Sequence, residues 1–392
     1  MRKLTKILTV TAIATMGITG QMGAGIVHAA DIKLPKTVVW TAYNTGTSGY
    51  NQAVGIGSVL KNAYGVNLRV LPGKNDVSRL SPLRSNVAQF SATGSDSVYA
   101  QEAVYTFGTK SWGPQPIRLL MHNLADGCAV SLATAKDANI KTLDDLKGKR
   151  VAWVRGAPAL NQAVKSMLAY ANLTWADVEK VEVGGYGASV DGLINNDLDA
   201  FLGATFSSSM LKVEASPRGL YHPSTPHDDD KAWSRLNDVV PWYARHRCMQ
   251  GAGVPKAGYE GIATAYPILI STTKVDSDVT YNMTKAMYDH FDDYKATAPG
   301  ANGWAWERQK LESVFLPFHE GAVKYYKEVG KWSDKAQANQ DKNLKRQQTI
   351  IDAWKTYSDS APSDKDAFKT GWMKARAEAL TAAHMEPVFL SW

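Results

Sequence analysis

The sequence predicts an α/β protein built as two lobes joined by a hinge, because strand-like runs alternate with helical stretches along most of its 392 residues. Several of the strand runs end in turns made of glycine and small polar residues. About 360 residues remain after an apparent leader, which is more than a single hydrophobic core usually holds. A parallel sheet is the arrangement that this alternation favours, with ligands bound at the carboxyl ends of its strands.

The first thirty residues have the pattern of a secretory signal peptide. Arg2, Lys3 and Lys6 precede a short apolar run, and small residues end the segment at Ala29 and Ala30. The run is too short for a convincing membrane span, and no later stretch approaches the length of one. We therefore expect cleavage after Ala29 or Ala30, a periplasmic protein, and no membrane span in the mature chain.

The charge and the motifs exclude several classes of function. Loss of the three basic residues of the leader lowers the formal net charge from +7 to +4, and no basic run stands out, so we expect no nucleic-acid partner. The sequence contains no nucleophile elbow and no HExxH pair. We accordingly predict no catalytic residue, no metal and no cofactor, and we assign His319 a structural role at the start of a helix.

Two cysteines are present, Cys128 and Cys248, without the spacing of a metal site. In an oxidising compartment they are able to pair, and closing so long a loop contributes on the order of 4 kcal/mol in the chain-entropy model. Two unpaired buried thiols are the alternative, and the sequence leaves both open.

The stretch from Thr37 to Leu60 reads as strand, turn and helix. A run of strand formers ends in a turn with Gly46 and Gly49, after which apolar residues recur at helical spacing. The N–H groups at the start of this helix lie at the positive end of its dipole, and such a place binds anions. The alternative is an ordinary turn with Ser48 as N-cap. The candidate ligand contacts here are Thr45, Gly46, Thr47, Ser48, Gly49 and Tyr50.

Two further strand runs end in polar turns. The strand expected over residues 66–71 leads to a turn with Asn75, and the strand expected over 88–92 leads to a turn with Ser95 and Asp96. Three such ends in succession are less easily explained as surface loops than one. Asn75, Ser95 and Asp96 are therefore candidate ligand contacts.

These three turns resemble the TAXI class of solute receptors of tripartite ATP-independent periplasmic (TRAP) transporters. That family has motifs close to Gly-Thr-x-x-Gly-x-Tyr-Tyr, Gly-Ser-x-Glu-Asn-Leu and Gln-Ser-Asp-x-x-Tyr-x-Ala at the corresponding places. This chain has Asn44-Thr-Gly-Thr-Ser-Gly-Tyr50, Gly73-Lys-Asn-Asp-Val-Ser-Arg-Leu80 and Ser95-Asp-Ser-Val-Tyr-Ala100. The resemblance implies a two-lobe fold of the periplasmic-binding-protein (type II-like) kind, with a TRAP membrane permease as partner. The chain departs from the motifs at five positions: Asn51, Lys74, Ser78, Arg79 and Gly94.

The next part of the chain is expected to cross into a second lobe and build its sheet. Strands are expected at 116–122, 128–134 and 151–154, and the segment 140–151 resembles one common to many periplasmic binding proteins. A small-residue turn then opens a helix, and another strand, helix and strand follow over 181–202. The candidate ligand contacts of this lobe are Trp153, Arg155, Gly156, Ala157, Tyr186, Thr205 and Ser207.

The last third of the chain is expected to return to the first lobe. Segments 254–261 and 316–330 resemble the family, whereas two helical patterns, at 339–357 and 363–383, lie beyond it. We expect these two helices to pack on the first lobe. The predicted domains are the signal peptide (1–30), lobe I (31–124 and 262–330), lobe II (125–261) and the C-terminal extension (331–392), with hinges at 124–128 and 259–263.

The sequence therefore predicts a monomeric receptor that closes two lobes on a small organic acid or an amino acid. The negative charge of the acid would lie at the helix start at 45–50, and Arg155 would bind a second acidic group. Trp153 and Tyr186 would line the remainder of the ligand site. An unpaired Asp96 would instead suit an ammonium group. The alternatives are a ligand-sensing subunit for a membrane histidine kinase and an exported enzyme of the same architecture.

Overall fold

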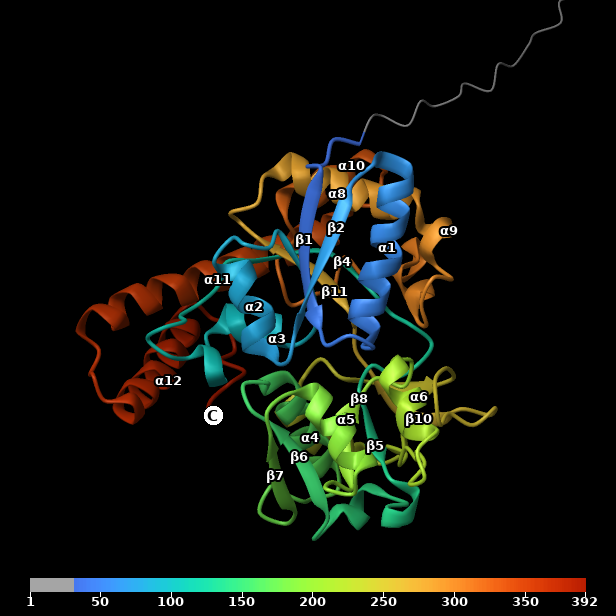
Figure 1. Cartoon of the computed structure of the whole chain (residues 1–392). Helices are drawn as coiled ribbons and strands as arrows, with labels where there is room; N and C mark the ends of the chain where they lie inside the picture. Colours follow the sequence, from blue (N-terminus) through green and yellow to red (C-terminus); the bar gives the residue numbers. More distant parts are fainter. Residues whose placement is uncertain (1–31) are drawn as a thin grey trace, which may run out of the picture. The chain divides into compact units, whose positions relative to one another are not determined.

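The computed structural model describes Ile32–Trp392 as one compact unit. The predicted signal peptide and its cleavage site lie outside the described residues. Two mixed sheets with helices packed on them make up the described part, so the predicted α/β fold with two lobes is confirmed (Figure 1). No helix of this described part is long and apolar enough to cross a membrane.

The first lobe contains a sheet of five strands. They are β1 (Thr37–Tyr43), β2 (Asn67–Gly73), β3 (Phe90–Thr93), β4 (Ile117–His122) and β11 (Ile268–Thr272). Their spatial order is β2-β1-β3-β11-β4, with β2 and β3 parallel to β1 and with β11 antiparallel to both of its neighbours. The parallel strands therefore end at the same edge of the sheet, and their turns lie together.

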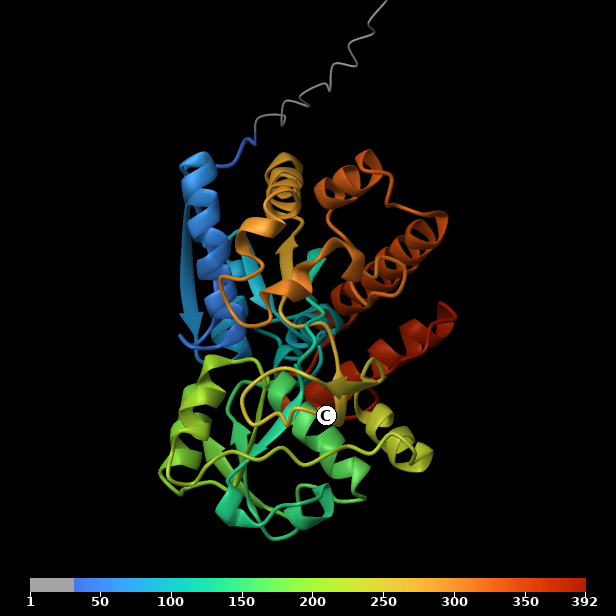
Figure 2. The same cartoon turned by 90° about the vertical axis from the view of Figure 1, so that its right-hand side faces the viewer.

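Helices of the first lobe follow the strands along the chain and cover the sheet. They are α1 (Ser48–Tyr64), α2 (Asp76–Arg84), α3 (Asp96–Glu102), α8 (Ser277–Asp289), α9 (Phe291–Tyr294) and α10 (Glu320–Glu328). The side chain of Thr47 caps α1, and Gly65 ends it in the left-handed conformation that glycine adopts at least cost. Helices α8 and α10 lie side by side, as Figure 2 shows.

The second lobe contains a sheet of four strands. They are β5 (Ser131–Thr134), β6 (Arg150–Val154), β7 (Glu179–Val183) and β8 (Ala200–Gly203), in the spatial order β5-β8-β6-β7. Its helices are α4 (Pro158–Tyr170), α5 (Tyr186–Ile194), α6 (Ser208–Glu214) and α7 (Asp230–Val239). A separate hairpin pairs β9 (Ala244–Cys248) with β10 (Tyr259–Ala263).

Short 3-10 turns occur in both lobes, at Tyr105–Phe107, Lys136–Ala138, Leu143–Leu146, Ala301–Trp304 and Trp306–Arg308.

Two chain segments run side by side between the lobes. Asn123, directly after β4, accepts a hydrogen bond from the N–H of Tyr266 (2.9 Å) and donates one to the carbonyl of Pro267 (3.0 Å). Farther along, Val130 forms an antiparallel bridge with Ile262. The paired backbones fix the outward and return crossings against each other, which is the arrangement of a two-stranded hinge.

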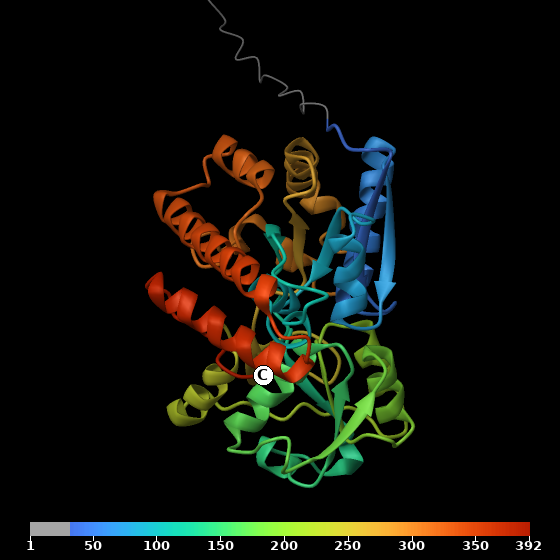
Figure 3. The same ribbon diagram turned by 90° about the vertical axis from the view of Figure 1, so that its left-hand side faces the viewer.

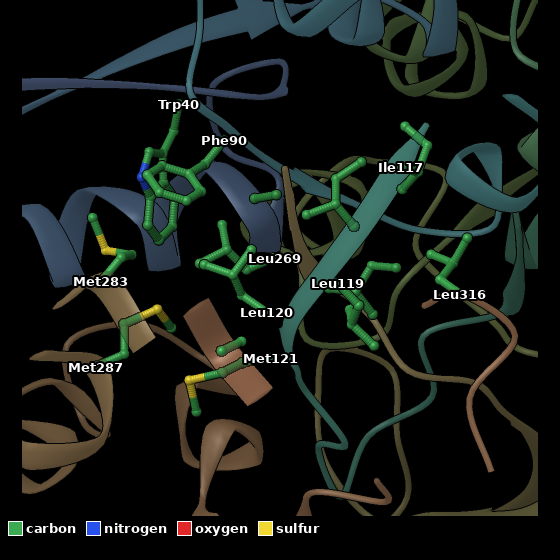
Figure 4. Close-up of a cluster of buried hydrophobic side chains, with 14 of the residues drawn as sticks. Trp40, Phe90, Ile117, Leu119, Leu120, Met121, Leu269, Met283, Met287 and Leu316 are labelled. Atoms are coloured by element: carbon green, nitrogen blue, oxygen red, sulfur yellow. The ribbon is translucent and has the colours of Figure 1, made fainter. Parts of the chain in front are cut away.

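Each lobe has its own hydrophobic core. Trp40 and Phe90 pack edge to face in the first lobe, 6.1 Å between ring centroids, near Met283 and Met287 of α8 (Figure 4). The second lobe buries apolar residues on both faces of its sheet. Separate cores allow each lobe to keep its internal packing when the angle between them changes.

The C-terminal extension forms two helices, α11 (Asp334–Ser360) and α12 (Lys365–Ala382), which pack against each other (Figure 3). The Trp372 indole donates to the carbonyl of Ala103 at 2.7 Å, just after α3. Glu102, at the end of α3, pairs with Arg346 of α11 and with Arg376 of α12. The extension is thus attached to the first lobe by a buried ionic cluster as well as by apolar packing.

Candidate functional site

A small cavity lies between the two sheets, where the carboxyl ends of β1 and β3 face the second lobe. Its volume is about 60 Å³. The first lobe contributes Tyr43, Thr47, Ser48, Arg79, Gly94, Ser95 and Asp96, and the second contributes Ala129, Val130, Ala159, Leu160, Tyr186, Leu202, Gly203, Ala204 and Ser207. Tyr243, Thr264, Ala265 and Tyr266 complete the wall. This is the place where α/β sheets bind ligands.

The N-terminus of α1 faces this cavity. Thr47 is its N-cap, because the Thr47 hydroxyl accepts from the N–H of Tyr50 at 3.4 Å, so Ser48 is not the cap that the alternative interpretation of this turn assumed. Ser48 lies one position inside the helix, and its hydroxyl is buried without a hydrogen-bond partner among the described residues. A buried hydroxyl and the free N–H groups of a helix start together form a set of donors for an anion.

A buried arginine forms the second polar feature. Arg79 of α2 is 1% exposed, and its guanidinium reaches both carboxylate oxygens of Asp96, at 2.7 and 3.2 Å. It also contacts Asp76 at 3.5 Å and lies 3.7 Å above the centre of the Tyr43 ring. Arg79 was noted from the sequence only as a departure from the family motif. It was not predicted as a site residue. The signal that would have identified it is the acidic charge nearby in the sequence: Asp76 lies three residues before Arg79, and Asp96 lies seventeen residues after it.

Asp96 is fully engaged, so it is not the unpaired carboxylate that would favour an ammonium group. Besides Arg79, it accepts hydrogen bonds from the Thr93 hydroxyl (2.6 Å) and from the N–H of Gly94 (2.9 Å). The physical reason is local: Asp96 begins α3, and its side chain turns back to the strand end that precedes the helix. Asp96 therefore offers no free carboxylate to an ammonium group.

The fold strongly perturbs the carboxyl group of Asp76. Burial, followed by the negative charge of Asp96, raises the pKa of Asp76 to about 7, although Arg79 and the hydroxyl of Tyr43 oppose the shift. Burial likewise raises the pKa of the Tyr43 hydroxyl well above its usual range, and Asp76 adds to that effect. Near neutral pH the charge of the cluster therefore depends on whether Asp76 holds a proton.

The two lobes are joined around the cavity by hydrogen bonds from several loops. Tyr43 of the first lobe stacks on Tyr186 of the second, 5.9 Å between ring centroids and 9° between ring planes. The bonds, named donor first, are Tyr186 N to Lys74 O (2.9 Å), Val77 N to Gly156 O (3.2 Å), Ser209 N to Gly46 O (3.1 Å), Ala159 N to Asp76 Oδ2 (2.8 Å) and Asn75 Nδ2 to Arg155 O (2.9 Å). These contacts define a closed arrangement of the lobes.

A model of the family described as NMT1-like matches residues 39–330. The chain belongs to the NMT1-like family. The matched part contains both sheets and the cavity between them, whereas the C-terminal extension of this NMT1-like protein lies outside it.

Several solved structures are similar to this NMT1-like chain at low identity. An ancestral arginine-binding protein bound to arginine is 13% identical, with a TM-score of 0.43, and the match covers 69% of this chain and 99% of that one. An alkanesulfonate-binding protein from Xanthomonas axonopodis pv. citri bound to MOPS is 11% identical, with a TM-score of 0.42 and coverages of 83% and 94%. A protein from Bordetella bronchiseptica RB50 is 15% identical, with a TM-score of 0.43 and coverages of 89% and 98%.

Some predicted contacts line the cavity of this NMT1-like protein, and others lie close to it. Thr47, Ser48, Ser95, Asp96, Tyr186 and Ser207 line it. Gly46, Asn75 and Gly156 are outside the wall but hold the lobes together through the bonds given above. Three others lie near the wall without being part of it: Gly49 and Tyr50 in the first turn of α1, and Ala157 before α4.

Four predicted contacts do not reach the cavity. Thr45 is exposed on the turn after β1, and Trp153 packs under the ammonium of Lys180, 5.5 Å from the ring centre. Arg155, one residue beyond β6, is exposed and pairs with Glu182, whose register partner in β6 is Trp153. The Thr205 hydroxyl serves the backbone, since it donates to the carbonyl of Gln250 at 2.6 Å.

The two cysteines form a disulfide between Cys128 and Cys248. Cys128 lies in the outward crossing, and Cys248 ends β9. The bond fastens the β9–β10 hairpin beside the crossing strands. Among Ile32–Trp392 no group of three side chains is arranged to hold a metal ion.

Proposed function

We propose that this protein is a solute-binding receptor that encloses a small organic acid between its lobes and delivers it to a membrane transporter. One observation carries the proposal: a cavity between the lobes brings together the N–H groups at the start of α1 and the Ser48 hydroxyl, which has no partner among Ile32–Trp392. These groups are hydrogen-bond donors, and they face a place from which closure removes competing water. The guanidinium of Arg79 also lines the cavity, but it forms ion pairs with Asp96 and Asp76.

The size of the cavity restricts the ligand. The cavity has a volume of only about 60 Å³ in this closed arrangement. The closed form therefore has room for a small acid only. A short monocarboxylate or the smallest amino acids fit this limit, whereas a long dicarboxylate would require the lobes to stop short of the closed arrangement.

The partner we propose is a TRAP permease, with the chain as a receptor of the TAXI class. Support comes from the motifs at Asn44–Tyr50, Gly73–Leu80 and Ser95–Ala100, all three of which supply residues of the cavity wall. Genes for a large multi-span TRAP permease beside the gene for this protein would support the assignment. Genes for the permease and ATPase of another transporter class in that place would contradict it.

Thermal unfolding in the presence of single compounds tests the ligand class, because a ligand that binds only the folded state raises the melting temperature by mass action. Acetate, pyruvate, lactate and glycine are the short probes, with glutamate and benzoate as long ones and with glucose and choline as non-acids. We expect the short acids to stabilise most. Stabilisation by glucose or choline, together with no effect of any acid, would show that the anion site is wrongly assigned.

Ser48→Ala tests the site itself. A hydrogen bond to a charged group contributes about 1.5–3 kcal/mol, so the variant should bind the short acid at least about tenfold more weakly. Ser58→Ala is the matched control, since Ser58 lies on the same helix and is exposed. Equal loss of affinity in both variants, or in neither, would remove Ser48 from the site.

A further inference from the structure

A second and larger cavity adjoins the first on the side of the crossing strands. Its volume is about 220 Å³, and it shares Gly94, Ser95, Thr264 and Ala265 with the first cavity. Apolar side chains form most of the remaining wall: Val98, Leu119, Leu124, Ile268, Val314 and Leu316. The proposed receptor function does not use this space.

The size and lining of this second cavity suit a ring-sized apolar molecule. A cavity of about 150 Å³ lined by aliphatic and aromatic residues stays dry in another protein and binds benzene. The present cavity is larger, and two aromatic rings, Trp242 and Phe315, lie at its side with 5.3 Å between their centroids. A flat molecule would bury apolar surface against these rings as well as against the aliphatic wall.

A buried histidine adds one polar requirement. His122, at the end of β4, lines the cavity, and its Nε2 accepts from the N–H of Lys310 at 2.7 Å. Burial lowers the pKa of His122 to about 4, so the ring is neutral at ordinary pH. Nε2 also lies 3.2 Å from the carbonyl of Arg308, but the shorter bond from the N–H of Lys310 makes Nε2 an acceptor and leaves the proton on Nδ1. Nδ1 is buried without a partner among the residues that the structure describes, so a ligand with a hydrogen-bond acceptor satisfies it better than a hydrocarbon does.

The wall also contains a residue that contacts both lobes. Trp242 follows α7 of the second lobe, packs against the cores of both lobes, and donates from its indole to the Ser95 hydroxyl at 3.2 Å. The backbone of the return crossing, Ala263 to Ala265, forms another side of the cavity. A molecule held here would touch elements whose relative position changes on closure, and so it would favour one position over the other.

We propose that the second cavity binds a small, flat, mainly apolar molecule with one hydrogen-bond acceptor, of the class of aryl ketones, and that its occupancy favours the closed lobes. This ligand differs in chemistry from the acid of the first cavity, which needs donors for a full negative charge. By linkage, the aryl ketone and the acid each raise the affinity of the protein for the other.

The test uses 4-fluoroacetophenone, observed by fluorine NMR in the presence of the full mature chain. Fluorine line broadening should give a dissociation constant below about 5 mM, which a ligand of this size reaches at ordinary efficiency. 4-Fluoroethylbenzene has nearly the same shape without the acceptor and should bind several-fold more weakly. Adding the short acid that the thermal screen identifies should tighten the binding of the ketone.

Two variants locate the site. Val314→Trp fills the cavity from a half-buried position and should weaken ketone binding at least tenfold, while Val279→Trp makes the same change at a half-buried position on α8 outside the cavity. If Val314→Trp does not fold, Ala244→Phe fills the cavity from its exposed rim. The proposal is overturned if the ketone does not bind at 5 mM, or if it binds the filled variant as well as Val279→Trp.

Discussion

Glu102 is a buried carboxylate at the end of α3 that forms ion pairs with two arginines. Its side chain is 3% exposed, Arg376 beside it is 0% exposed, and Arg346 completes the cluster. Burial alone would raise the pKa of Glu102, but Arg376 and Arg346 outweigh it and lower that pKa below its usual value. The negative charge on Glu102 pairs with both arginines, which would otherwise lack a partner of opposite charge in an apolar region.

Glu102→Gln should therefore lower the free energy of unfolding by about 3–5 kcal/mol, the usual cost of leaving a buried charge without its partner. Glu378→Gln removes a carboxylate from an exposed pair with Lys374 and should change stability by less than about 0.5 kcal/mol. Urea unfolding at neutral pH measures both. A loss below about 1 kcal/mol in Glu102→Gln would mean that the cluster does not anchor the extension.

The same cluster sets a direction for acid unfolding. Because the folded-state pKa of Glu102 is depressed, its contribution is present above the usual pKa of a glutamate, about 4, and is lost as the pH falls through the lower folded-state value. Urea midpoints between pH 5 and 2 should therefore fall less steeply in Glu102→Gln than in the unaltered protein. Parallel pH profiles would contradict the depressed pKa.

At the scale of elements, the starts of α2 and α4 meet between the lobes. Asp76 is the first residue of α2, and one of its carboxylate oxygens accepts from the N–H of Ala159 in the first turn of α4. Two positive helix ends thus share one carboxylate, which offsets their mutual repulsion in the closed form. Opening the lobes would break this contact and let water reach the side of Asp76 that faces α4, while Arg79 and Tyr43 of the first lobe stay beside it.

Closure should consequently depend on pH. With a pKa of about 7 in the closed form and a lower pKa in the open form, where water reaches it, Asp76 takes up a proton when the lobes close at a pH between the two values. Acidification from pH 7 to 4 should then favour closure, by at most about tenfold for each pH unit, and Asp76→Asn should remove most of this dependence. X-ray scattering across this pH range is the measurement; an unchanged dependence in Asp76→Asn would assign it to another group.

Elements with strong periodicity could be predicted from the sequence, and buried polar contacts could not. The strands at residues 66–71 and 116–122 lie within a residue or two of β2 and β4, because their apolar patterns depend only on local order. Arg155 was predicted to face a ligand because it lies in a small-residue turn that opens a helix, but its ion pair with Glu182 depends on which residues of β6 and β7 lie side by side. Arg79 was missed for the same reason: its partner Asp96 lies on the turn after another strand.

At the scale of the whole molecule, the proposed receptor must open to admit its ligand. The hydrogen bonds between the lobes and the stacked Tyr43 and Tyr186 surround the cavity, so the closed arrangement has to be preceded by a more open one. Small-angle scattering should give a smaller radius of gyration with a bound short acid than without it. The predicted lobe boundaries and the monomeric state are tested by the same data, through the molecular mass and the fit of two rigid bodies.

An unchanged radius of gyration, combined with turnover of the bound compound, would favour the exported enzyme instead.

Tyr186→Ala offers a matched variant, since it removes the second-lobe ring that stacks on Tyr43 while it leaves the donors of α1 in place. We expect this variant to bind the acid more weakly and to close less completely.

The disulfide also has a mechanical consequence. Cys128 and Cys248 are 120 residues apart, and all four strands of the second sheet lie between them. When the chain is pulled from its two ends, force passes across the sulfur–sulfur bond and bypasses the second lobe. An optical-tweezers experiment should therefore record a total extension shorter by about 400 Å than after reduction, since each residue adds roughly 3.3–3.6 Å when extended. With the bond intact, this lobe would carry no load even while the first lobe unravels around it.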